Sequence, residues 1–170
     1  MNQDELLVAL CKTLLAETER QPGWSKLIMV GEMDGGSAGM AGYSFDLSGQ
    51  WKATSPRGGE SLDLLEQLHE AMTAASPTGR PWLACLLRIG SNGEVGADFE
   101  YDDAERWAIN PRNLEQRIAE FAAMRILPHM VRYSARQSAA KTIYSPIPLT
   151  SQPVHDHRGT VRWHRRDGLQ

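Results

Sequence analysis

The chain has 170 residues, of which 41% are apolar and 23% are charged, as is usual for a single globular domain with a sizeable core. Its formal net charge of -3 is unevenly distributed, because residues 1–124 carry a balance of -9 and residues 125–170 a balance of +6. No apolar run approaches the roughly 20 residues of a membrane-spanning helix, and residues 1–20 have no basic start like that of a signal peptide, so we expect a cytoplasmic protein.

Helical and strand patterns alternate along the first half of the chain. Residues 4–19 place four leucines at helical spacing, which predicts an amphipathic helix. Residues 26–34 and 40–49 are predicted to form two strands of a hairpin around the glycine-rich turn 35–39. Residues 50–55 follow as a third short strand.

The second half repeats this order. Ser61 is predicted to cap a helix carried by Leu62, Leu65, Leu68 and Met72. Residues 82–89 are a nearly continuous apolar run between breakers, which favours a buried strand, and "VGADFEYD" is expected to pair back onto it. Asn110 and Pro111 predict the start of a third helix that reaches residue 124.

The order helix, strands, helix, strands, helix predicts an α+β fold. We expect an antiparallel sheet of about four to five strands with the helices packed on one face. Residues 1–124 are predicted to form this domain. Residues 125–170 are predicted to be a basic extension that contains Pro, Arg and His and is poorly ordered, with a short helix at 129–142.

The sequence contains no recognisable catalytic or cofactor motif. There is no GxSxG, and the glycine-rich segments match neither phosphate-binding pattern, so we expect neither an enzyme nor a cofactor. Cys11 and Cys85 lie among apolar neighbours and are expected to be buried free thiols. His69 is expected to be a solvated or half-buried helix residue.

Two alternative functions stay open at this point. The acids of residues 98–103, or the histidines His155, His157 and His164, could serve a small metal-binding protein or enzyme. Alternatively, the basic segment could make the chain a nucleic-acid-associated module, although the acidic body would repel a phosphate backbone.

Acidic and apolar residues alternate in the stretch "EVGADFEYDD" at 94–103. In a strand this alternation places Val95, Ala97, Phe99 and Tyr101 on the core face and Asp98, Glu100 and Asp102 on the opposite face, which we expect to be exposed. The stretch therefore predicts an acidic surface for a cationic protein partner. Other residues expected to extend this surface are Glu32, Asp34, Asp46, Trp51 and Asp103.

About residues 1–105 resemble the YezG-type family of antitoxins and polymorphic-toxin immunity proteins. The resemblance is carried by "PGWSKLIMVGEMDGGSAGMAGYSF", by "SGQW" and by "GRPWLACLLRIGSNGEVGADFEYDD", which follow a short N-terminal helix in the family's order. The "DFEYDD" motif is the most specific of these segments. Residues after "YDD" depart from the family's short form.

The resemblance implies an α+β immunity protein that binds and neutralises a cognate bacterial toxin by direct contact. In several members of the family that toxin is a nuclease. No catalytic residues carry over, and no membrane or direct nucleic-acid partner is expected. Reversing the charges of Asp98, Glu100 and Asp102 together is expected to weaken toxin binding and leave the fold nearly unchanged.

Overall fold

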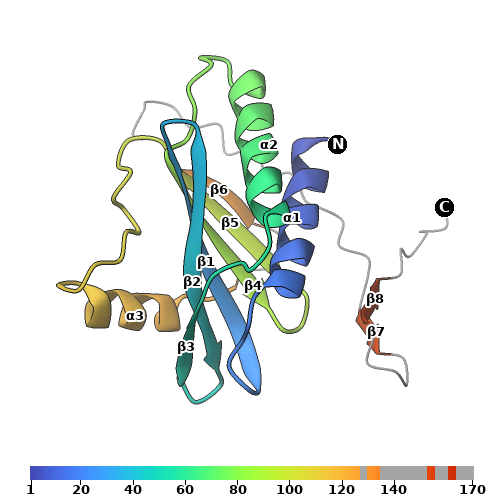
Figure 1. The fold of residues 1–170 in the computed structure, drawn as a ribbon, viewed down its shortest axis with the longest axis vertical. Helices are drawn as coiled ribbons and strands as arrows, with labels where there is room; N and C mark the ends of the chain where they lie inside the picture. The colour runs from blue at the N-terminus through green and yellow to red at the C-terminus, as the bar shows by residue number, and fades with distance from the viewer. Residues whose placement is uncertain (127–129, 135–152, 156–160, 164–170) are drawn as a thin grey trace.

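The computed structural model describes the backbone of residues 1–126, 130–134, 153–155 and 161–163, and the side chains of residues 1–126. Its main sheet has six strands in the order β3–β2–β1–β4–β5–β6 (Figure 1). The helices are α1 (Gln3–Glu17), α2 (Glu60–Ala75) and α3 (Leu114–Ala123), and the strands of this sheet are β1 (Trp24–Asp34), β2 (Ser37–Asp46), β3 (Trp51–Thr54), β4 (Ala84–Gly90), β5 (Val95–Glu100) and β6 (Met130–Ser134).

The predicted fold class and element order are confirmed. Strands β1 to β5 pair with one another in antiparallel fashion, and the helices occur at the predicted places in the chain. All seven residues of β4 are buried, as the apolar run at 82–89 predicted. No helix within the described residues is both long enough and apolar enough to cross a membrane.

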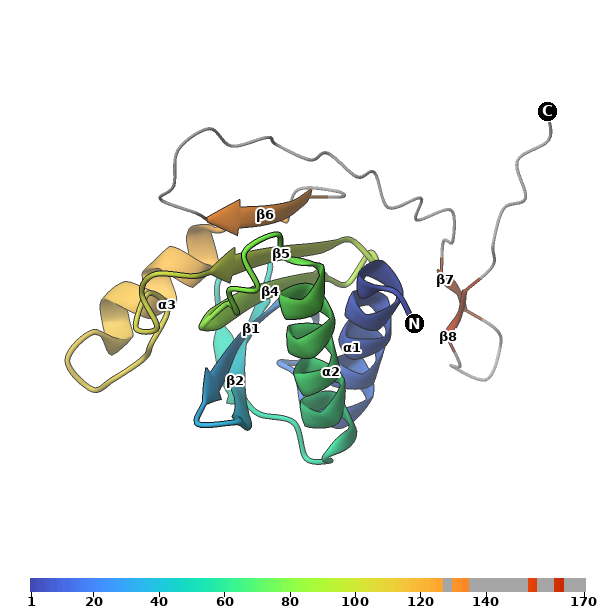
Figure 2. The same ribbon diagram turned by 90° about the horizontal axis from the view of Figure 1, so that it is seen from above.

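The helices cover both faces of the sheet, so the prediction that they share one face is wrong for α3. Figures 1 and 2 show α1 and α2 side by side on one face and α3 on the other. The reason lies in β1, where Leu27 and Met29 belong to the core under α1 and α2 while Ile28 and Val30 belong to the core under α3. A strand that is apolar on both faces needs cover on both.

Two predicted helix starts differ from the structure. Gly59, not Ser61, precedes α2, and the Ser61 hydroxyl instead donates a hydrogen bond to the Glu17 carboxylate of α1. Helix α3 begins at Leu114 rather than at Pro111. Asn110 accepts hydrogen bonds from the backbone N–H groups of Arg112 and Asn113, which stabilises a turn ahead of the helix.

The sheet extends past residue 124, the predicted end of the domain. Residues 130–134 form β6, which pairs in parallel with β5, so the short helix predicted at 129–142 is wrong for these five residues. A separate antiparallel pair joins β7 (Pro153–His155) and β8 (Val161–Trp163). Apart from residues 125 and 126, the remainder of the predicted C-terminal extension lies outside the described residues.

Candidate functional site

The alternation predicted for "EVGADFEYDD" is correct on its apolar side. Ala97 and Phe99 are buried in the core under α1 and α2, and Val95 and Tyr101 pack against the same core. Phe99 contacts the Trp82 ring, with ring centroids 5.5 Å apart. The apolar half of this stretch therefore builds the sheet's main core.

The acidic side of β5 is not the exposed surface that the sequence suggested. The sheet face that carries Asp98 and Glu100 is covered in part by Trp107 and by Phe121 of α3. Asp98 forms an ion pair with Arg88 on β4, with an N–O distance of 2.8 Å and side chains that are 17% and 7% exposed. Because both side chains are largely buried, this ion pair belongs to the interior of the domain and not to a surface that a partner could contact.

Glu100 is 3% exposed and organises the turn that follows β5. Its Oε1 accepts backbone hydrogen bonds from Tyr101 at 3.0 Å and Asp102 at 2.9 Å, and its Oε2 lies 3.0 Å from the guanidinium of Arg106. Burial raises the pKa of Glu100, but these hydrogen bonds and the charge of Arg106 outweigh it, so the pKa lies below its usual value. Glu100 is thus a buried carboxylate that stabilises the turn after β5 in its ionised form.

Reversing the charges of Asp98, Glu100 and Asp102 together should therefore destabilise the fold, which corrects the expectation of a nearly unchanged one. Of the three, only Asp102 is exposed, and it pairs with Arg80 at 2.7 Å. Asp103 is also exposed, and its carboxylate accepts the backbone N–H of Glu105.

Asp46 has a structural position in the turn between β2 and β3. Its Oδ1 accepts hydrogen bonds from the Ser48 N–H at 2.8 Å, the Ser48 hydroxyl at 2.7 Å and the Gln50 N–H at 3.0 Å. The bond from the Ser48 hydroxyl is the main cause that holds the pKa of Asp46 below its usual value. Because one carboxylate oxygen of Asp46 already accepts three hydrogen bonds, the main role of this side chain is to stabilise the turn.

Trp51 is 45% exposed on the edge strand β3, and its ring meets Tyr43 edge-on with centroids 5.4 Å apart. Trp51 pairs with Phe45 near the end of β2, whereas Asp34 pairs with Ser37 at its start. The length of β2 therefore separates Trp51 from Glu32 and Asp34. The expected surface is divided between two ends of the sheet.

One end of the domain gathers carboxylates from three elements, and all of them except that of the half-buried Glu66 are exposed. Glu32 and Asp34 lie at the end of β1, Glu66 and Glu70 lie on α2, and Asp102 and Asp103 follow β5. Residues 76–83, which connect α2 to β4, contact two of these groups. Arg80 forms an ion pair with Asp102, and residues 81–83 line a pocket together with Glu66 and Glu70. We call the six carboxylate residues the acidic end: Glu32, Asp34, Glu66, Glu70, Asp102 and Asp103.

The acidic end has little compensating positive charge. Glu32, Asp34, Glu66 and Glu70 form no ion pair within residues 1–126. The nearby cations Arg80 and Arg106 are already paired with Asp102 and Glu100. This end therefore presents uncompensated negative charge, which would attract a cationic surface.

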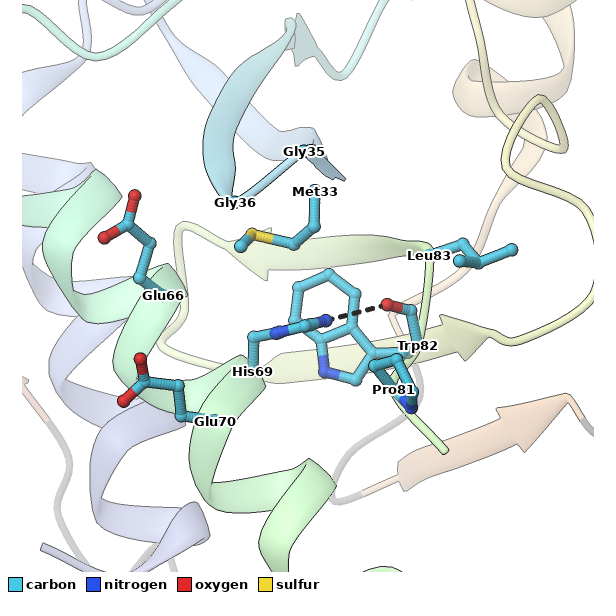
Figure 3. A pocket seen from close by; sticks show the side chains of 9 residues that line it. All are labelled: Met33, Gly35, Gly36, Glu66, His69, Glu70, Pro81, Trp82 and Leu83. Atoms are coloured by element: carbon cyan, nitrogen blue, oxygen red, sulfur yellow. Dashed lines mark hydrogen bonds between the residues drawn. The ribbon is translucent and has the colours of Figure 1, made fainter. Parts of the chain in front are cut away.

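A pocket of about 300 Å³ opens at the same end, between α2, the β1–β2 hairpin and the start of β4 (Figure 3). We call it the α2 pocket. Its lining combines apolar side chains, two turn glycines, two carboxylates and one imidazole: Met33, Gly35, Gly36, Glu66, His69, Glu70, Pro81, Trp82 and Leu83.

His69 and Trp82 form the inner part of the α2 pocket. The two rings meet edge-on with centroids 4.6 Å apart, and His69 Nε2 lies 3.0 Å from the Trp82 carbonyl oxygen. Because a carbonyl only accepts, Nε2 carries the proton and the other ring nitrogen is an acceptor in the neutral imidazole. His69 is half-buried, as expected from the sequence.

Glu66, His69 and Glu70 were not selected from the sequence as a group. Their signal was present, because residues at i, i+3 and i+4 share one face of a helix. The sequence could not indicate that residues 35–36 and 81–83 lie next to this helix face and form a pocket with it.

The described side chains offer no metal site, and the two cysteine thiols are not activated. Within residues 1–126 no three His, Cys, Asp or Glu side chains lie where they could hold a metal ion together. Cys11 and Cys85 are buried, as predicted, and burial raises the pKa of both thiols to about 12. The side chains of His155, His157 and His164 lie outside the described residues.

The comparisons with known proteins add no family. The chain matches no protein-family model, and no curated protein matches it either.

Proposed function

We propose that this protein is an immunity protein, or antitoxin, that binds a cognate bacterial toxin directly and has no catalytic activity of its own. The observation that carries the proposal is the acidic end, where Glu32, Asp34, Glu66 and Glu70 stand without ionic partners in residues 1–126. The resemblance of residues 1–105 to the YezG-type family supplies the class of partner.

The acidic end suits a toxin with a cationic active site, such as a nuclease. Exposed carboxylates can occupy the positions that nucleic-acid phosphates take in such a site. The attraction between opposite charges speeds the encounter and is weakened by salt, because ions screen exposed charges. Binding through this end would block the toxin's substrate without any chemical step.

The test is a pull-down of the product of the adjacent toxin gene with the full-length protein, at low and high salt. Glu32→Lys/Asp34→Lys should weaken toxin binding by about tenfold or more, because it turns attraction into repulsion. Glu60→Lys/Glu115→Lys is the matched control, since it reverses two exposed, unpaired carboxylates at the starts of α2 and α3.

Neutralisation is measured in parallel by growth of cells that co-express toxin and protein. The control should protect the cells, and the Glu32→Lys/Asp34→Lys variant should protect them less. A folded, active toxin that neither binds the wild-type protein nor is neutralised by it would overturn the proposed function.

A further inference from the structure

We infer that the α2 pocket receives a single arginine side chain of the partner protein. This inference rests on the proposed function, because it specifies how the toxin would engage the acidic end. It concerns residues that the sequence alone did not single out as a site: Glu66, His69, Glu70 and Trp82.

The charge of the α2 pocket is negative and uncompensated. Glu66 and Glu70 lie at i and i+4 on α2, a spacing at which like charges repel each other and destabilise a helix. Helix α2 contains Glu60, Asp63, Glu66 and Glu70 but no Lys or Arg. A cation placed beside Glu66 and Glu70 would remove their repulsion, so the pair is arranged to gain from binding one.

The rest of the lining suits a long aliphatic stem. Met33, Pro81 and Leu83 offer apolar atoms around a floor made by Trp82, which is 1% exposed. Gly35 and Gly36 have positive φ angles, and a Cβ atom on either would meet nothing within 4 Å, so the hairpin turn leaves this side of the pocket open. The entrance therefore admits a side chain from outside.

Figure 3 shows how the two kinds of surface divide the pocket. The Met33, His69 and Trp82 side chains lie close together, and the carboxylates of Glu66 and Glu70 extend from α2 apart from this group. A ligand that fills both parts needs an apolar stem and a positive head. Arginine has this form, and its planar guanidinium bonds carboxylates through two parallel hydrogen bonds.

The size of the cavity also favours a side chain over a larger ligand. About 300 Å³ is at the small end of the range of about 300–1,000 Å³ found for ligand pockets. Because the pocket lies within the acidic end, an arginine that projects from a cationic surface would reach it as that surface docks.

The first experiment titrates the full-length protein with N-acetyl-arginine amide, a blocked arginine, and follows the Trp82 indole and His69 ring signals by NMR. We expect saturable shifts of both signals, and no saturable shift with the neutral isostere N-acetyl-citrulline amide. Glu66→Gln/Glu70→Gln should weaken binding of the blocked arginine at least tenfold. The control Glu60→Gln/Glu115→Gln, which removes two carboxylate charges outside the pocket, should leave it unchanged.

Two results of the titration would overturn the inference. One is the absence of saturable shifts, or equal shifts with the citrulline probe. The other, in a parallel titration with agmatine, is binding of agmatine without binding of the blocked arginine, which would identify a small-molecule amine site. Circular dichroism spectra of each variant, compared with wild type, establish that a loss of binding is not a loss of fold.

The second experiment uses the toxin pull-down. Glu66→Gln/Glu70→Gln should weaken toxin binding at least tenfold relative to its control, and unchanged binding would overturn the inference while the proposed function stands. Because the probe titration needs no toxin, a toxin that fails to bind at all counts against the proposed function alone.

Discussion

The side-chain amine of Lys26 on β1 lies 2.9 Å from the backbone carbonyl oxygen of Phe121, near the end of α3. The same amine donates to the carbonyls of Ala122 at 2.6 Å and Met124 at 2.7 Å. A positive charge at the C-terminus of a helix satisfies carbonyls that have no partner within the helix and also opposes the negative end of its dipole. Lys26 therefore fastens α3 to the sheet.

Replacing Lys26 by Met should release α3 locally. The variant keeps an unbranched apolar side chain, but it removes the amine that lies 5.3 Å from the centroid of the Phe45 ring and leaves three carbonyls without a charged donor. This should cost about 1–2 kcal/mol. Hydrogen exchange measured by mass spectrometry should show faster exchange in residues 114–123 than in wild type, with α1 and α2 unchanged. Lys52→Met, which removes an exposed lysine paired with Glu19, is the control. Equal exchange in both variants would contradict this role of Lys26.

Removing one member of the Arg88–Asp98 pair should be more harmful than removing both. Asp98→Asn leaves the Arg88 guanidinium buried without its counter-ion, so we expect a loss of about 3 kcal/mol in the free energy of unfolding. The double variant Arg88→Met/Asp98→Asn should recover part of that loss. Urea denaturation of both variants measures the difference, and a double variant less stable than Asp98→Asn would refute the expectation.

Glu100 should make stability depend on acid pH. Its pKa is lower in the folded protein than in the unfolded chain, so its ionised form stabilises the fold above the unfolded-state pKa of about 4.3. That contribution is lost as the pH falls through the lower, folded-state pKa. Glu100→Gln should therefore be less stable than wild type at pH 7 and lose less stability between pH 5 and pH 3. Urea midpoints at several pH values provide the measurement, and parallel curves for the two proteins would be the contrary result.

Replacing each of two glycines of β2 by alanine should change stability by very different amounts. A Cβ atom at Gly42 would lie 1.9 Å from the backbone carbonyl oxygen of Ile28, so β1 and β2 would have to separate. We expect Gly42→Ala to lose about 3 kcal/mol or more. Gly39→Ala, in the same strand, meets nothing within 4 Å and should change stability by less than about 1 kcal/mol. Thermal melts of the two variants compare them directly, and equal melting temperatures would show that the strand can adjust.

The local pattern of the sequence was sufficient for the elements and the fold class. The leucines in residues 4–19 and the alternation at 95–101 each have one dominant periodicity, and the apolar run at 82–89 is short and bounded by breakers. Each formed the predicted element. The predicted hairpins formed as well, because short glycine-containing turns leave antiparallel pairing as the natural outcome.

The surroundings of the acids depended on contacts between distant segments. Alternation correctly assigned Asp98 and Glu100 to the face opposite Phe99, but whether that face meets water depends on α3 and Trp107, which follow later in the chain. The charge partner of Asp98 comes from β4 and that of Glu100 from a loop residue, Arg106. No periodicity within β5 contains that information.

The sequence by itself thus determined the elements and the core-facing residues of α1, α2 and β5, because the repeat of their apolar residues matches the side-chain period of a helix or a strand. Only the tertiary structure decided which charges remain available to a partner. It paired Asp98 and Glu100 internally, engaged Asp46 in a turn, and separated Trp51 from Glu32 and Asp34. It also brought Glu66 and Glu70 beside Trp82 to form the α2 pocket, because a charge's environment is set by segments that only the folded chain places next to it.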